Sequence, residues 1–270
     1  MELTGKKIAF IGAGNMGEAM IRGLLKAGVS KPAELSACDL REEKLAALSA
    51  ELGIRTFIDA RQAARQAQII VLAVKPQGFP ELLKELSGQL NSDQLVISIA
   101  AGVTLAKIAA ALPGSPLVRV MPNTPALVGH GASAFCLGTL ANADHAKQAT
   151  ALLACLGLVL QVEEGQMDAV TALSGSGPAY VFLFMEALQA AGLKLGLNAE
   201  QSFSLAARTI SGAAAMIEAR QDDPATLRKK VTSPGGTTEA ALKVFESGDL
   251  RGLVEKAMRA ANDRSKELGR

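Results

Sequence analysis

Residues 7–17 read KIAFIGAGNMG, and this stretch decides the fold. The run KIAFI is short and apolar, as in a strand buried in a sheet, and apolar side chains then repeat at helical spacing over 15–27. Between the two stands the pattern G-x-G-x-x-G. Its glycines permit a tight turn (Gly12), the close approach of a pyrophosphate (Gly14) and close packing of helix on strand (Gly17). The motif predicts a dinucleotide-binding turn; a glycine-rich turn that merely begins a helix is the alternative.

Strands and helices are predicted to alternate through the first 160 residues or so. After the strand at 7–11, short apolar runs predict strands at 34–38, 54–57, 69–74, 95–99 and 117–120. The polar stretches before the later strands are helix-forming, and one helix is expected over 42–51. Strands that alternate with such helices imply βαβ crossovers and a mainly parallel sheet. The predicted fold class is therefore α/β, with an N-terminal Rossmann-type doubly wound sheet.

The pattern becomes helical after residue 162. No stretch between 166 and 270 predicts a strand, and Gly, Pro, Asn or Asp interrupt the helical stretches at 175–178, 196–198, 222–224 and 233–236. We therefore predict two domains, a Rossmann domain over 1–163 and an all-α domain over 164–270.

The helix that begins near Pro178 has an unusual composition. Residues 181–185 read VFLFM and are apolar on every face, whereas a surface helix of a monomer keeps a polar stripe. We expect this helix to be buried all round, either deep in the helical domain or against a second subunit.

An acidic residue stands where a dinucleotide site needs one. Asp39 follows Gly17 by 22 residues and ends the second predicted strand, where it would hydrogen-bond the adenosine ribose of NAD. Arg41 would instead pair with the 2′-phosphate of NADP, so NADH is favoured only slightly. A solvated Asp at a strand end is the alternative, and Lys75 could equally be a solvated charge. Because the carboxyl ends of parallel strands line one crevice, the predicted cofactor contacts are Gly12, Ala13, Gly14, Asn15, Met16, Gly17, Asp39, Arg41, Ala73, Val74, Lys75, Pro76, Ile99, Ala100 and Ala101.

Composition argues against several other classes of protein. Lys and Arg number 28 against 26 Asp and Glu, there is no Trp and Tyr180 is the only Tyr, so a nucleic-acid-binding surface is not expected. Three distant cysteines without a CxxC pair predict neither a metal site nor a disulfide framework. The apolar runs fall short of the ~18 residues of a membrane span, and the N-terminus has no signal-peptide pattern. We expect a cytoplasmic protein.

Three further segments carry a family resemblance. They are MPNTP at 121–125, LSGSGPAY at 173–180 and TSPGGTTE at 232–239. Together with GAGNMG, AVKP and SIAAGVT, in this order over nearly the whole chain, they resemble pyrroline-5-carboxylate reductase. The resemblance implies NAD(P)H-dependent reduction of 1-pyrroline-5-carboxylate to L-proline, the last step of proline synthesis. It also implies that the helical domain interlocks with a second subunit in a homodimer or a larger homo-oligomer.

The TSPGGTTE segment has a physical interpretation beside the resemblance. Two glycines ahead of a helix present backbone N–H groups at the positive end of the helix dipole, which suits a substrate carboxylate. A plain helix N-cap is the alternative. By resemblance, Gly236 and Thr237 hold the carboxylate and Thr238 reaches the ring nitrogen as the catalytic contact. Glu164 matches a position near the family's substrate site, or is a solvated charge at the domain boundary. The predicted substrate contacts are Asn123, Glu164, Ser176, Ser233, Gly235, Gly236, Thr237 and Thr238.

The reaction needs little acid–base chemistry. A protonated iminium exists in water near neutral pH, so hydride can reach the imine carbon without a strong enzymic acid, and catalysis would depend on positioning. His130 and His145 lie outside the family motifs. Family members often carry Ser or Thr where Asp39 stands, which puts a preference for NADPH in doubt.

Two other functions compete with this one. A β-hydroxyacid dehydrogenase would need a helical Lys as proton donor, and Lys194 fits poorly because Gly196 follows it near a helix end. A cofactor-sensing Rossmann module would not need the carboxylate-sized site at 233–238.

Overall fold

The computed structural model describes residues 2–219 and 222–269. The outer ends of the two predicted domains, residues 1 and 270, lie outside the described residues. The chain forms two compact units, the first made of residues 1–176 and 261–270 and the second of residues 177–260.

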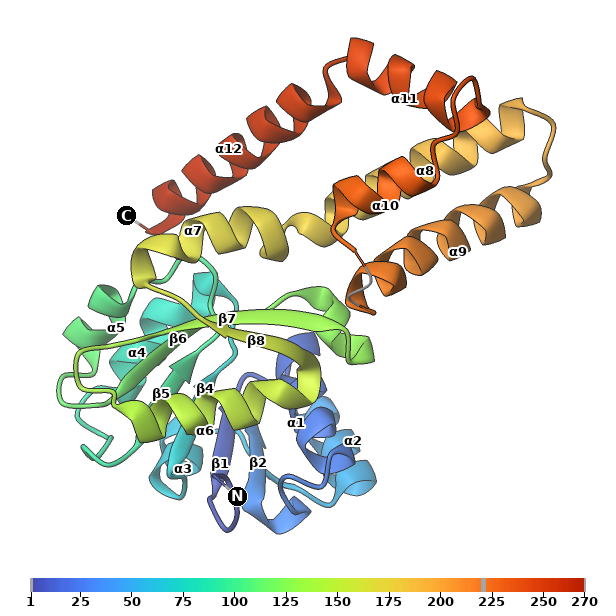
Figure 1. The fold of residues 1–270 in the computed structure, drawn as a ribbon. Helices are drawn as coiled ribbons and strands as arrows, with labels where there is room; N and C mark the ends of the chain where they lie inside the picture. The colour runs from blue at the N-terminus through green and yellow to red at the C-terminus, as the bar shows by residue number, and fades with distance from the viewer. Residues whose placement is uncertain (1, 220–221, 270) are drawn as a thin grey trace. The chain divides into compact units, whose positions relative to one another are not determined.

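The first unit is built around one eight-stranded sheet (Figure 1). Its strands are β1 (Ile8–Ile11), β2 (Leu35–Cys38), β3 (Arg55–Phe57), β4 (Ile69–Leu72), β5 (Leu95–Ser98), β6 (Leu117–Met121), β7 (Gly131–Leu137) and β8 (Gly157–Gln161). They lie in the order β3-β2-β1-β4-β5-β6-β7-β8, and every neighbouring pair is parallel except β6 with β7. The order reverses at β1. The chain continues from β1 to β2 and β3 on one side of β1, and then returns to form β4 on the other side. This is the doubly wound topology that the sequence predicts.

Two hydrophobic cores cover the two faces of this sheet. Alternate residues of β1 point to opposite faces, so Ile8 and Phe10 join one core while Ala9 and Ile11 join the other. The first core contains α1 (Asn15–Lys26), α2 (Glu42–Leu52) and α6 (Ala143–Leu153). The second contains α3 (Ala60–Arg65), α4 (Phe79–Leu86), α5 (Leu105–Ala111) and α7 (Met167–Val170).

The sequence did not predict β7 and β8. The β7 sequence GASAFCL contains small residues that favour no strand by themselves, and β7 is held by pairing with strands on both sides. At the edge of the sheet, β8 leaves Leu158 and Leu160 more than half exposed. An apolar run of this length after a helix does not by itself distinguish a strand from helix. The other six strands lie within a few residues of the predicted positions.

The second unit contains helices and, among its described residues, no strand. It comprises α8 (Gly177–Lys194), α9 (Ala199–Glu218), α10 (Pro224–Lys230), α11 (Thr237–Ser247) and the first part of α12 (Leu250–Gly269), whose end belongs to the first unit. α8 packs closely on α9. A Cβ on Gly192 of α8 would lie only 2.9 Å from Oγ of Ser202 on α9, so the contact leaves little room for a side chain at this position. The prediction that no strand follows residue 166 thus agrees with the structure over the described residues.

The expected interruption at 175–178 is confirmed. A π-helical turn at Thr171–Gly175 follows α7, Ser176 lies outside both helices, and α8 begins at Gly177. The Ser176 N–H donates to the Thr171 carbonyl oxygen at 2.8 Å, which is the wider hydrogen bond of a π turn. Gly177 and Pro178 form the first turn of α8, where Pro is tolerated.

The apolar helix α8 is not buried within this chain. Its side chains Val181, Phe182, Leu183 and Phe184 are 46%, 59%, 67% and 43% exposed. Burial deep in the helical domain, one of the two expectations, is therefore wrong. The remaining expectation is a partner subunit.

The two glycines that flank the start of α1 make different demands on the fold. A Cβ at Gly17 would overlap the carbonyl oxygen of Gly12, whereas a Cβ at Gly14 would meet no atom within 4 Å. Gly14 has φ −66°, which any residue adopts.

We expect Gly17→Ala to lower the free energy of unfolding by about 1–3 kcal/mol, because it overpacks the contact between α1 and the turn. Gly14→Ser is the matched control, because Ser is a favoured N-cap residue and its Cβ would meet no atom within 4 Å, and it should change the free energy of unfolding by less than ~0.5 kcal/mol. Urea unfolding of both variants measures the difference. Equal destabilisation by the two substitutions would contradict the packing role of Gly17.

Candidate functional site

The glycine-rich turn lies where the ends of three strands meet. Gly12 has φ +103°, and a Cβ there would lie 2.6 Å from the carbonyl carbon and oxygen of Ala73. The Gly12 N–H donates to the Cys38 carbonyl, and the Ala73 N–H donates to the Ile11 carbonyl, each at 2.7 Å. The carboxyl ends of β1, β2 and β4 are thereby joined at the point where the strand order reverses. In open α/β sheets this is the place where a ligand binds.

The start of α1 is open to a ligand. Gly14 is the N-cap residue of α1 and has no side chain to cap the helix. The first N–H groups of any helix lack partners within it, and they lie at the positive end of its dipole. The open space at Gly14 therefore faces donors that suit a pyrophosphate.

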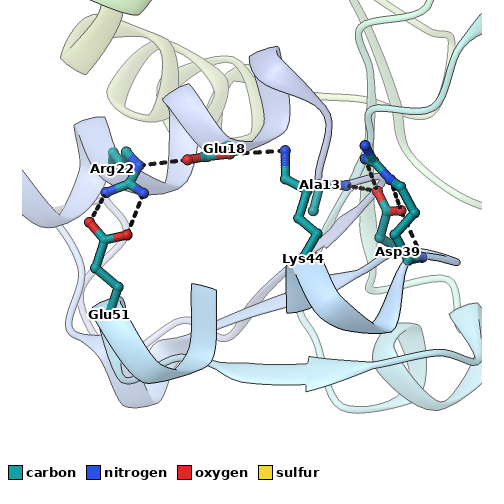
Figure 2. A network of polar contacts seen from close by, with 7 residues as sticks. Ala13, Glu18, Arg22, Asp39, Lys44 and Glu51 are labelled. Carbon is teal, nitrogen blue, oxygen red and sulfur yellow. Dashed lines mark hydrogen bonds and ion pairs between the residues drawn. The ribbon is translucent and has the colours of Figure 1, made fainter. Parts of the chain in front are cut away.

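The Asp39 carboxylate is hydrogen-bonded to the glycine-rich turn and forms an ion pair with Arg41 (Figure 2). Its Oδ2 accepts from the Ala13 N–H at 2.9 Å, and its Oδ1 accepts from Arg41 Nε at 2.9 Å. Arg41 holds the pKa of the Asp39 carboxyl at about 2, so Asp39 remains ionised at neutral pH. The Asp39 side chain is 12% exposed and that of Arg41 is 61% exposed. Asp39 is thus not the freely solvated carboxylate of the alternative interpretation.

A chain of ion pairs joins α1 to α2 beside this site (Figure 2). Arg22 on α1 contacts Glu18 at 2.9 Å and Glu51 on α2 at 2.5 Å, and Lys44 on α2 contacts Glu18 at 2.9 Å. Exposed pairs of this kind add little stability. Their effect is positional, because they tie the helix after the glycine turn to the helix that follows Arg41.

The other predicted cofactor residues lie at the same edge of the sheet. Lys75 and Pro76 follow β4 and are exposed, and Ile99 follows β5 and donates its N–H to the Leu72 carbonyl at 3.1 Å. Ala100 is buried, while Ala101 is half-buried. The structure therefore brings the predicted residues of β1, β2, β4 and β5 to adjacent strand ends.

Two predicted substrate residues use their side chains within the first unit. Asn123 donates Nδ2–H to the backbone and hydroxyl oxygens of Ser174 at 3.3 Å, and its Oδ1 accepts from the Ala132 N–H at 2.9 Å. Glu164 Oε1 accepts from the Leu105 N–H at 2.7 Å and from Arg119 Nη1 at 3.2 Å. Glu164 is therefore not a solvated boundary charge. Of Ser176, the third predicted residue in this unit, only the backbone bond of the π turn is recorded.

The remaining predicted substrate residues precede or begin α11 in the second unit. Gly235 has φ +70° and donates its N–H to Glu239 Oε2 at 2.6 Å. The Gly236 N–H donates to the Ser233 carbonyl at 3.0 Å. The two glycine N–H groups expected to bind a carboxylate thus have partners within the chain. The half-buried Thr238 lies with Thr237 in the first turn of α11, where N–H groups lack helical partners.

Two charged residues that contact predicted substrate residues were not predicted from the sequence, Arg119 beside Glu164 and Glu239 beside Gly235. Arg119 lies in LVRVM, the sequence of β6, and is 5% exposed; a charge inside an apolar strand was the signal that could have found it. Glu239, the second missed residue, accepts a hydrogen bond from the Gly235 N–H, and its Oε1 lies 3.1 Å from Nζ of Lys243. Hydrogen bonding from the Gly235 N–H lowers the Glu239 pKa. Its position at the third residue of α11, where acids favour the helix dipole, was the available signal.

Residues 2–219 and 222–269 contain neither a cluster of metal ligands nor a membrane-spanning helix. No group of three or more His, Cys, Asp or Glu in these ranges could hold a metal ion. Within the same ranges, no helix combines the length and the apolar character needed to cross a membrane.

Two protein families match successive parts of the chain. The family described as pyrroline-5-carboxylate reductase dimerisation matches residues 164–268, and the family described as NADP oxidoreductase coenzyme F420-dependent matches residues 7–102. The pyrroline-5-carboxylate reductase of Pseudomonas aeruginosa is 45% identical, with 97% of this chain and 96% of that protein covered. The enzyme of the same name from Methanosarcina acetivorans is 41% identical, with 99% and 100% covered.

Solved structures give the same result. A pyrroline-5-carboxylate reductase from Coxiella burnetii has a TM-score of 0.93 and 42% identity, with 98% of this chain and 99% of that chain covered. A pyrroline carboxylate reductase from Plasmodium falciparum, solved with NADP bound, has a TM-score of 0.88 and 32% identity over the same shares. The predicted fold class and family resemblance are confirmed. The chain belongs to the pyrroline-5-carboxylate reductase family and is an NAD(P)H-dependent oxidoreductase.

Proposed function

We propose that this chain reduces 1-pyrroline-5-carboxylate to L-proline by transfer of a hydride from NAD(P)H, the last step of proline synthesis. The observation that carries the proposal is the edge where Gly12 contacts Ala73 and Gly14 leaves room for a pyrophosphate, in a chain whose close relatives bear this enzyme's name. The motif segments at 121–125, 173–180 and 232–239 supply the substrate side of the proposal.

We propose residues 1–163 as the NAD(P)-binding domain and residues 164–270 as the helical dimerisation and substrate domain. The match of the dimerisation family from residue 164 supports this division. Compactness alone places the division later, after Ser176, and assigns the end of α12 to the first unit.

The substrate's carboxylate would be bound at the start of α11. Because Gly235 and Gly236 already donate to partners within the chain, the first-turn N–H groups of Thr237 and Thr238 are the better candidates for the carboxylate. The Thr238 hydroxyl would hydrogen-bond the ring nitrogen of the iminium form or of the amine that results. The bound nicotinamide supplies the hydride, and these residues hold the imine carbon in line with it.

Asp39 and Arg41 together would set the choice of cofactor. The Ala13 N–H and Arg41 fix the Asp39 carboxylate near the expected ribose position, so Asp39 meets an NADH ribose without rearrangement. Arg41 must leave Asp39 to pair with a 2′-phosphate, and that phosphate would then face the Asp39 charge. Both cofactors serve, and NADH is modestly preferred.

A second copy of this chain is the proposed partner of α8. Four consecutive large apolar side chains, residues 181–184, are each more than 40% exposed. A patch of this kind marks an interaction surface, and the dimerisation family matches this region. The active site would then include helices of both subunits.

We also propose a cytoplasmic location. Cys38, Cys136 and Cys155 are free thiols. Burial raises the pKa of the Cys38 thiol to about 12 and those of the other two to about 11, which keeps them protonated and unreactive. Free thiols without a disulfide framework suit a reducing compartment.

The purified protein should oxidise NADH and NADPH when 1-pyrroline-5-carboxylate is added, with a modest preference for NADH. It should not do so with the keto form of a β-hydroxyacid. Asp39→Ser should shift the ratio of kcat/KM values toward NADPH by about tenfold, because it removes a charge near the 2′-phosphate. Arg41→Ala should impair NADPH selectively.

Asp39→Asn is the matched control for the cofactor test, because it removes the charge while keeping an acceptor for the Ala13 N–H. It should shift the ratio as Asp39→Ser does. A hundredfold preference of the unmodified protein for NADPH would show that Asp39 does not face the ribose.

Thr238→Ala should lower kcat by about 5- to 30-fold with little change in NADH affinity, because a hydrogen bond of ~1–2 kcal/mol to the ring nitrogen is lost. Thr238→Ser keeps the hydroxyl and should retain most of the activity. Steady-state kinetics with both variants distinguishes a hydrogen bond to the ring nitrogen from a purely structural role in the first turn of α11. An unchanged kcat in Thr238→Ala would show the structural role alone.

Light scattering should give at least a dimer at micromolar concentration. Leu183→Glu should shift the mass toward the monomer, because it places a charge in the patch at 181–184. Ala47→Glu, at an exposed position of α2, is the matched control and should leave the mass unchanged. A fully active monomer would contradict both the shared helix and the shared active site.

A further inference from the structure

The loop after β5 is held by residues that lie far from it in the sequence. We call residues 99–104 the β5 loop. Its first residue, Ile99, is bonded to the end of β4, and Thr104 caps the start of α5 by accepting from the Lys107 N–H at 3.3 Å. Two contacts from near the ends of the region matched by the dimerisation family, 164–268, also reach this loop.

Glu164 makes the first of these contacts. The N–H of Leu105, the first residue of α5 and the neighbour of the last loop residue, donates to Glu164 Oε1 at 2.7 Å. The same oxygen accepts from Arg119 on β6 at 3.2 Å. The Arg119 side chain is only 6% exposed, and a buried guanidinium requires a counter-ion. Arg119 therefore fixes the carboxylate that in turn fixes the end of the loop.

The last turn of α12 makes the second contact. Gly102 is buried with φ +74°, and a Cβ there would lie 2.9 Å from Cβ of Leu268. The turn is anchored by Ser265, which is 4% exposed and donates its hydroxyl to Asp168 Oδ1 on α7 at 2.6 Å. All of these residues belong to the first compact unit.

We propose that Glu164, Arg119 and the last turn of α12 are positioning residues for the nicotinamide ring, acting through the β5 loop. The proposal rests on the cofactor site proposed above, in which Ile99, Ala100 and Ala101 form a wall beside that ring. Hydride transfer requires the reacting atoms to be held ~3–3.5 Å apart, and small displacements of the groups that position them are costly. Glu164 acts here through the loop and not by contact with the substrate.

The two roles of Glu164 predict different kinetics. Loss of a loop contact should weaken NAD(P)H binding, whereas loss of a substrate contact should raise KM for 1-pyrroline-5-carboxylate. Glu164→Ala should raise KM for NAD(P)H roughly five- to tenfold, because only part of the stabilisation from the lost charge-assisted hydrogen bond reaches the cofactor through the loop, and should change the substrate's KM less than about twofold. Glu164→Gln keeps an acceptor for the Leu105 N–H and should have a smaller effect. Glu163→Gln, at the exposed neighbouring acid, is the control and should behave as the unmodified protein.

Deletion of residues 266–270 removes the second contact and keeps the hydrogen bond between Ser265 and Asp168. It should weaken NAD(P)H binding in the same direction, and Lys266→Ala, at an exposed position in that turn, should not. Fluorescence titration with NAD(P)H measures the affinity without substrate, and thermal unfolding shows whether each variant is folded. This readout stays valid even if 1-pyrroline-5-carboxylate proves not to be the substrate.

Two results would overturn the proposal. One is an increased substrate KM with unchanged NAD(P)H affinity in Glu164→Ala, which would make Glu164 a substrate contact. The other is unchanged NAD(P)H affinity in both the folded Glu164→Ala variant and the folded deletion variant. Absence of turnover in the unmodified protein, with normal NAD(P)H binding, would instead contradict the proposed substrate.

Discussion

The structure of the cofactor edge depends on one contact between two strand ends. Gly12 approaches Ala73 so closely that no side chain fits between them, and its φ of +103° suits glycine alone. This contact sets how near the turn after β1 comes to the end of β4, and so where α1 begins. Gly17 completes it by letting α1 lie against the same turn. The open position at Gly14, the bonded position of Asp39 and the adjacent end of β5 all follow from this arrangement.

The fold could be predicted where burial acts on both faces of a strand. β1, β2, β4 and β5 are buried throughout, which gives each a largely apolar run that stands out from the polar helical stretches around it, although β2 and β5 each include a buried serine. β7 and β8 lack this signal because one is rich in small residues and the other lies at the edge. Gly and Pro predicted the interruption at 175–178, where one helical segment ends and α8 begins. The π turn at 171–175 was not predicted, because no residue type in that stretch distinguishes a π turn from an α-helical one.

The meeting of the predicted cofactor residues at one edge of the sheet was easier to predict than the contacts of the predicted substrate residues. The cofactor residues follow successive strands, and parallel strands bring their carboxyl ends together whatever the rest of the chain does. The partners of Glu164, by contrast, are Arg119 and Leu105, which lie 45 and 59 residues away. Only the tertiary structure determines such a pair. The bond between Gly235 and Glu239 is local, yet it depends on a left-handed glycine whose conformation the sequence allows without requiring it.

The continuity of α12 limits how the chain can be divided. This helix begins in one compact unit and ends in the other, so the backbone passes between the units twice, after Ser176 and after Ala260. Met167, which is fully buried in the second core, lies beyond residue 163 as well. A chimera that exchanged residues 1–163 between two relatives would therefore separate one hydrophobic core from part of its own packing. Residues 1–163 are therefore not an interchangeable module. Met167 and the last turn of α12 belong to the same compact unit and would have to be exchanged together with them.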